Sequence, residues 1–190
     1  MLKKLVFGQI ILLIFQGVSY FGCEIFQHHF HNVKCKCDDY IPFIPYTGLI
    51  YILWFPLIFL FPIVLGYYDH DIYHDYILAM ILEIILSVIC YLIYPTTFDR
   101  PKCDNKLMNV IYKGSFRGVN CAPSLHCSSC YLVIYSAIKA ISMPFYTRII
   151  SIIVALGIVI STMTTKQHTI IDVLTAIALF MICLFMVKVI

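Results

Sequence analysis

The chain has 190 residues, of which 62% are hydrophobic and only 12% are charged, and its net charge is +3. Soluble domains carry about a quarter charged residues. This chain therefore has too few charges to cover a water-exposed surface, and we expect an integral membrane protein. The composition excludes a secreted disulfide scaffold, a disordered chain and a nucleic-acid-binding domain. The net charge is too small to indicate binding of a polyanion.

Six apolar stretches approach the roughly 20 residues that a helix needs to cross a bilayer. They are residues 5–21, 47–67, 76–94, 124–141, 149–163 and 169–190. Their number and short connections predict an all-α bundle of six transmembrane helices that forms a single domain over residues 1–190. The fourth stretch contains polar residues, among them His126 and Lys139, which must face protein or a water-filled cavity.

The N-terminus begins with Lys3 and Lys4 before an apolar run, as a signal peptide does. The run is long, however, and bulky Tyr20 and Phe21 stand where a cleavage site needs small residues, so we expect an uncleaved first span. If the two lysines are cytoplasmic, both termini lie inside. Eight basic residues then lie outside and five inside, against the positive-inside rule. We nevertheless predict this orientation, in a bacterial plasma membrane.

The longest polar segment is the link over residues 95–123. Two acidic residues and five basic ones give it a net charge of +3, the charge of the whole chain; the basic residues are Arg100, Lys102, Lys106, Lys113 and Arg117. The link is either a solvated loop or patch that touches anionic lipid headgroups, or a cationic site for a phosphate group.

Two histidines favour the phosphate site. His126 follows the polar link, where Pro123 suits the first turn of a helix, and helix N-termini bind anions. His168 opens the last apolar stretch, and Asp172 follows four residues later, on the same helical face. The carboxylate can bind one imidazole nitrogen and leave the other free as a nucleophile or base. An isolated pair at a helix end is the alternative, but such a pair is costly at a membrane edge.

Three short motifs occur in order: Arg100-Pro101, then Pro123-Ser124-Leu125-His126, then Ser161 followed by His168 and Asp172. This set resembles the type 2 phosphatidic acid phosphatase superfamily, whose pattern is KxxxxxxRP, PSGH and SRxxxxxHxxxD on a six-helix membrane core. The chain departs from that pattern at Ile93, Leu125 and Thr162, which replace a lysine, a glycine and an arginine. The segment around Lys166 looks closer to the branch of inositol phosphorylceramide and sphingomyelin synthase-like proteins.

The resemblance implies a phosphohistidine mechanism without a metal or other cofactor. His168 would attack phosphorus, Asp172 would orient its ring, and His126 would protonate the leaving alkoxide. Charge on the phosphate oxygens would be offset by residues of the polar segments, namely Arg100, Lys166, Ser124, Arg117 and Lys102. The partner would be a lipid phosphate in the bilayer, with no nucleic acid and no obligate protein partner.

The leading hypothesis is therefore a lipid phosphatase acting on a phosphomonoester or diphosphate. A phospho-headgroup transferase is the first alternative, because water or an acceptor alcohol can resolve the same intermediate. The second alternative is a non-catalytic lipid- or metal-binding membrane protein. It would use the cluster of His28, His29, His31, Cys35 and Cys37, although this cluster lacks the spacing common in zinc sites.

Overall fold

The computed structural model describes residues 1–114 and 118–189, and the protein is 75% helical. Eight α-helices form most of it: α1 (Leu2–Glu24), α2 (Gly48–Ile52), α3 (Trp54–Tyr68), α4 (His70–Ile93), α5 (Lys106–Gly114), α6 (Leu125–Lys139), α7 (Phe145–Thr164) and α8 (Ile170–Val189). Two 3₁₀ turns, η1 (Lys36–Tyr40) and η2 (Pro45–Thr47), precede α2. Strands β1 (His31–Asn32) and β2 (Thr96–Thr97) pair in parallel.

Five helical segments in the described part of the chain are long and apolar enough to cross a membrane. They are Leu2–Glu24, Pro45–Tyr68, His70–Ile93, Phe145–Thr164 and Ile170–Val189. All six predicted stretches are helical, but α6 has only 15 residues, or about 22 Å at 1.5 Å per residue. The helices are compatible with an integral membrane protein, and the sixth crossing stays a prediction.

The outer faces of the long helices are apolar, and polar side chains lie inside. Large exposed hydrophobic residues include Phe7, Ile153 and Phe185, from α1, α7 and α8. In contrast, Glu83 and Asp172 are completely buried. An apolar exterior around a partly polar interior suits a bilayer, which offers polar groups no hydrogen-bond partner.

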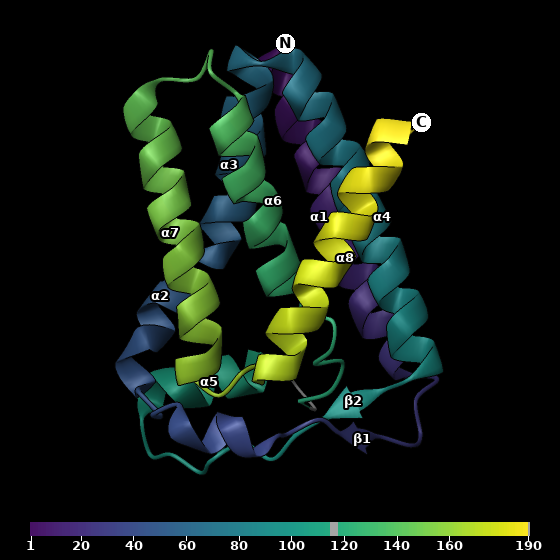
Figure 1. Ribbon diagram of the computed structural model, residues 1–190, viewed down its shortest axis with the longest axis vertical. Helices are drawn as coiled ribbons and strands as arrows, with labels where there is room; N and C mark the ends of the chain where they lie inside the picture. The colour runs from purple at the N-terminus through teal and green to yellow at the C-terminus, as the bar shows by residue number, and fades with distance from the viewer. Residues whose placement is uncertain (115–117, 190) are drawn as a thin grey trace.

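The helices run along one long axis, and both termini lie at the same end (Figure 1). The opposite end carries α5, β1 and β2. Helix α6 packs against α3, α4, α7 and α8. Its first residues begin well inside the bundle, farther from that end than the nearby ends of α7 and α8 (Figure 1). The segment before α6 therefore carries polar residues into the interior.

The structure differs locally from the sequence predictions in four places. Helix α4 begins at His70 rather than near residue 76, because Asp69 caps it by accepting a hydrogen bond from the N–H of Ile72. The polar link contains the amphipathic helix α5, which buries Met108 and Ile111. Pro123 does not belong to the first turn of α6, since Ser124 is its N-cap. The paired strands add a small β element to the predicted all-α fold.

Candidate functional site

The pair of His168 and Asp172 forms where α8 begins. Nδ1 of His168 lies 3.3 Å from Oδ2 of Asp172. The same oxygen accepts the N–H of Thr169 at 2.7 Å, and the Thr169 hydroxyl accepts the N–H of Asp172 at 3.4 Å. This reciprocal arrangement is a capping box, which fixes the carboxylate at the helix start. His168 itself precedes α8, and its ring is oriented by Asp172, while no hydrogen bond to Nε2 is made by residues 1–114 or 118–189.

His126 lies in the first turn of α6, as predicted, between two aromatic rings. Its Nε2 is 3.0 Å from the hydroxyl of Tyr51 in α2, and the two rings stack at 5.0 Å. The Trp54 ring lies 4.2 Å from that of His126, between ring centroids. Trp54 is itself held, because its Nε1 donates to Ser129 one turn along α6 at 2.9 Å. These contacts restrict the orientation of the His126 ring.

The two histidines face each other from different helices. Their ring centroids are 5.6 Å apart and their planes are inclined by 52°. The N–H of Ser124 donates to the carbonyl of Asp172 at 3.3 Å, which ties the start of α6 to the start of α8. Residues separated by 42 positions in the chain thus come together as the motifs predicted.

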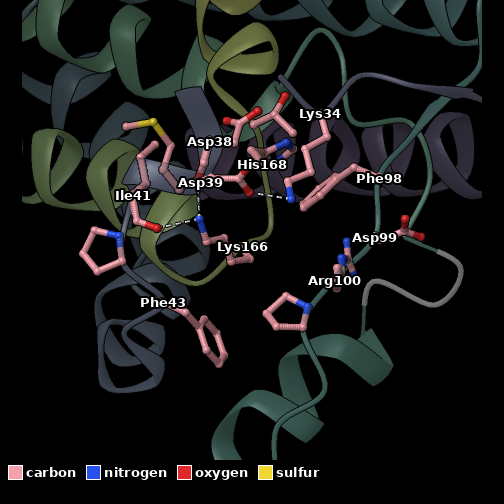
Figure 2. Close-up of a pocket in the computed structure, with 14 residues that line it drawn as sticks. Lys34, Asp38, Asp39, Ile41, Phe43, Phe98, Asp99, Arg100, Lys166 and His168 are labelled. Atoms are coloured by element: carbon pink, nitrogen blue, oxygen red, sulfur yellow. Dashed lines mark hydrogen bonds and ion pairs between the residues drawn. The ribbon is translucent and has the colours of Figure 1, made fainter. Parts of the chain in front are cut away.

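A polar cavity of about 490 Å³ opens beside His168. Figure 2 shows Lys34, Arg100, Lys166 and His168 around it, from three separate segments. Three acidic side chains also line the cavity: Asp38, Asp39 and Asp99. Cationic and acidic residues therefore balance in number, and the local pairings decide which charges face a ligand.

Lys166 joins the turn before α8 to η1. Its Nζ donates to the carbonyl oxygens of Asp38 and Ile41, each at 2.7 Å (Figure 2). The buried Asp38 carboxylate accepts the N–H of Ile170 at 2.8 Å through Oδ1 and that of Cys35 at 2.8 Å through Oδ2. Two of the three ammonium hydrogens of Lys166 thus bind the backbone, and one remains for a ligand.

Arg100 lies at the opposite wall of the same region. Its guanidinium carbon is 5.3 Å from the centroid of the Tyr112 ring, a cation–π distance. Gly118 adjoins it, because a β-carbon built there would lie 3.2 Å from that guanidinium carbon. The φ angle of Gly118 is +65°, which favours glycine. The glycine therefore permits both the turn and the position of Arg100.

The other predicted phosphate ligands differ in placement. Ser124 is completely buried and caps α6 by accepting the N–H of Cys127, so it lines neither described cavity. Lys102 is exposed and likewise lines neither. Arg117 lies outside the described residues. Among the predicted cations, Arg100 and Lys166 line the polar cavity together with His168.

A surface ion pair lies at the rim of the polar cavity. Nζ of Lys34 lies 2.6 Å from Oδ1 of Asp39. The hydrogen bond to Asp39 raises the pKa of Lys34, and the same bond lowers the pKa of Asp39. Deeper in the site, burial raises the pKa of the Cys121 thiol, with a further contribution from nearby Asp172. Cys121 is therefore a neutral thiol at physiological pH.

A second cavity, also of about 490 Å³, lies between the helices. Aromatic and aliphatic side chains from α1, α2, α3 and α5 form most of its wall. Arg100 and His168 line both cavities, and His126 lines the second. His168 thus lies where the polar cavity meets the apolar one, and His126 faces it from the apolar side.

Sequence reasoning missed Tyr51, Trp54 and Lys34. Tyr51 and Trp54 stand in an apolar stretch, where aromatic residues are typical of membrane helices. Their three-residue spacing shows only that they share a helix face. Lys34 is one of several basic residues near the cysteine-rich segment. Nothing in the local sequence links it to a site more than 130 residues later.

The segment with three histidines and two cysteines does not form a cluster in the structure. His31 stacks on Tyr94 at 3.9 Å, whereas Cys35 is the N-cap of η1. Among the described residues, no three His, Cys, Asp or Glu side chains gather as metal ligands would.

No family model, curated protein or solved structure matches this chain.

Proposed function

We propose that this protein is a membrane-embedded lipid phosphate phosphatase in which His168 forms a covalent phosphohistidine. One observation carries the proposal: His168, oriented by Asp172, faces His126 at 5.6 Å where the polar and apolar cavities meet. An oriented nucleophile beside a second titratable ring is the arrangement that nucleophilic catalysis needs. The proposal places the substrate phosphate in the polar cavity and its hydrocarbon in the apolar one.

In the first step, Nε2 of His168 bonds to phosphorus as the bond from phosphorus to the lipid oxygen breaks. The proton on Nδ1 of His168 stays bound by Asp172, which stabilises the charge that develops on the ring. His126 gives a proton to the departing alkoxide, so that a lipid alcohol leaves. Since Tyr51 holds Nε2 of His126, Nδ1 is the atom that delivers this proton.

In the second step, water attacks phosphorus and the bond from phosphorus to Nε2 breaks. His126 accepts a proton from the water, inorganic phosphate leaves, and the free His168 imidazole returns. Arg100 and the remaining N–H of Lys166 stabilise the charge on the phosphate oxygens through both steps. Such fixed donors are effective because they need no reorganisation during the reaction.

The membrane arrangement is part of the proposal. Helix α6 completes six crossings with the five long apolar segments, which accounts for the two termini at one end (Figure 1). The site lies at the opposite end, which we place outside the cytoplasm of a bacterial cell. A short α6 fits this arrangement because its N-terminal end begins inside the bundle rather than at its surface.

Phosphate release from a panel of lipid monophosphates and diphosphates tests the proposal. The purified protein should release inorganic phosphate, His168→Ala should abolish release, and His126→Ala should reduce it nearly to background. Each variant should keep the thermal unfolding temperature of the parent within a few degrees. A folded His168→Ala protein that hydrolyses these lipids at the parental rate would falsify the assignment.

Phospho-headgroup transfer is the second candidate function. The supporting observation is that both histidines line the apolar cavity, where an acceptor lipid alcohol can approach phosphorus in place of water. The same assay run with a diacylglycerol or a long-chain alcohol separates the two functions. Phosphate appears in solution for the hydrolase, whereas a new phospholipid appears for the transferase.

A further inference from the structure

The wall of the apolar cavity contains a polar side chain deep in α1. Gln16 lies in the middle of this candidate membrane span, is 7% exposed and lines the cavity. No hydrogen-bond donor among the described residues reaches its Oε1. A buried acceptor without a donor costs about 1–3 kcal/mol. In the wall of a cavity, this acceptor can be reached by a ligand group that supplies the missing hydrogen.

Two other buried glutamines near α1 have structural roles that Gln16 lacks. Nε2 of Gln9 donates to the carbonyl of Ile58 at 2.7 Å, which ties α1 to α3. Nε2 of Gln27 donates to the carbonyl of Tyr91 at 2.7 Å. Neither of these glutamines lines the apolar cavity. The Oε1 atoms of Gln9 and Gln27 also lack a donor among the described residues. Gln16 differs because its Oε1 belongs to a side chain that lines the cavity, where a ligand can reach it.

The position of Gln16 sets its distance from the reacting phosphate. Gln16 is one turn before Tyr20 in α1, about 6 Å along the helix axis. The Tyr20 hydroxyl donates to the carbonyl of Val119 at 3.1 Å, in the segment that leads into α6 and His126. Gln16, Tyr20 and both histidines line the same cavity. We therefore place the donor on the part of the lipid next to its phosphate.

We infer that the apolar cavity binds the single hydrocarbon chain of a lipid phosphate that carries a hydroxyl or amide N–H near its phosphate, and that Gln16 accepts this hydrogen bond. That the bound lipid carries a phosphate at one end rests on the proposed function. Leu13, Phe55 and Ile58 contact the chain, and Val110 and Ile111 of α5 cover it at the site end. A lipid that lacks the donor leaves Oε1 unpaired and binds more weakly.

Trp54 allows a direct test, because it is the only tryptophan of the chain and it lines the same cavity. The His168→Ala protein is used because this substitution prevents turnover. It is reconstituted in nanodiscs and titrated with two lipids. Both carry a dibromostearoyl chain, whose bromine atoms quench tryptophan fluorescence on contact. One is the 1-acyl glycerol 3-phosphate with a free 2-hydroxyl, and the other is the acyloxypropyl phosphate, which lacks that hydroxyl.

We expect both lipids to quench Trp54, with the hydroxyl-bearing one binding about tenfold more tightly. Introducing Gln16→Leu should reduce the ratio of the two affinities to within twofold, mainly because the hydroxyl-bearing lipid binds more weakly. Val18→Leu, on the exposed side of the same helix, should keep the ratio. Absence of quenching, equal affinities in the parent, or an equal loss for both lipids in Gln16→Leu would each overturn the inference. The assay involves no turnover, so a failure of the proposed phosphatase activity is seen separately as absent phosphate release.

Discussion

The hydroxyl of Tyr51 lies 3.0 Å from Nε2 of His126, and its ring stacks on the imidazole. We predict that Tyr51→Phe lowers kcat about tenfold with little change in KM, because His126 keeps its stacking partner but loses the contact that sets its tautomer. Phosphate-release kinetics across pH 5–9 measure this. Tyr46→Phe, at an exposed tyrosine in η2, is the control. Unchanged kcat in Tyr51→Phe would show that the hydroxyl does not position His126.

Asp172→Asn tests the orientation of His168. An amide oxygen can still accept the N–H of Thr169, so the start of α8 should form. The negative charge that stabilises the His168 ring in the reaction is lost, however, and we expect kcat to fall about a thousandfold. Circular dichroism and thermal unfolding check the fold. Asp71→Asn, at an exposed position in the first turn of α4, should behave as the parent. Comparable activity of Asp172→Asn and Asp71→Asn would show that Asp172 does not support His168 in the reaction.

Lys166→Met should affect stability as well as activity. The change removes a charged donor from the carbonyls of Asp38 and Ile41, and loss of such bonds costs about 2 kcal/mol. For a chain of this length we expect Tm in detergent to fall by about 5 °C. Lys106→Met, at an exposed position in α5, serves as the matched control. Equal Tm values would mean that Lys166 does not hold η1 against α8.

Gly118→Ala should disturb Arg100. The added methyl group meets the guanidinium carbon at 3.2 Å, and alanine is strained at a φ of +65° by about 1 kcal/mol. We expect a higher KM for the lipid phosphate and a modest loss of stability. Gly22→Ala in α1, where nothing lies within 4 Å of the new carbon, should retain the parental KM. A parental KM in Gly118→Ala would separate Arg100 from phosphate binding.

Cys37 reports on which side of the membrane the site lies. It is an exposed thiol in η1, next to the polar cavity. A membrane-impermeant maleimide should label it in intact cells, and Cys37→Ser should remove that part of the labelling. Labelling that depends on permeabilising the cells would place the site in the cytoplasm and contradict the proposed orientation.

The helical segments were predictable because apolar runs are long and uninterrupted, as at residues 169–190. Their boundaries were less so, because capping depends on single residues such as Asp69, whose side chain extends α4 over a polar stretch. Helix α5 was not foreseen, since its buried Met108 and Ile111 stand among basic residues. The small parallel strand pair depends on segments more than 60 residues apart, which no local pattern encodes.

The spacing predicted the approach of His168 to Asp172, but His168 lies outside α8, and the contact forms through the capping box of Thr169 and Asp172. The placement of His126 near them depended on the ordered motifs. In contrast, the contacts of Lys166 follow from its backbone conformation and from η1, which the sequence does not reveal. The position of Gln16 in a cavity wall could not be predicted from the sequence either, because only the fold shows which face of α1 borders a cavity.

The carboxylate of Asp38 has a consequence for how the protein is made. One of its oxygens binds the start of η1 and the other binds the N–H of Ile170, 132 positions later. During synthesis from the N-terminus, Asp38 is made long before α8, so its hydrogen bond to the N–H of Ile170 cannot form until α8 has been made. The orientation of His168 is therefore completed only when α8 docks. On the proposed function, nascent chains stalled before α8 would lack phosphatase activity, however many helices they had already inserted.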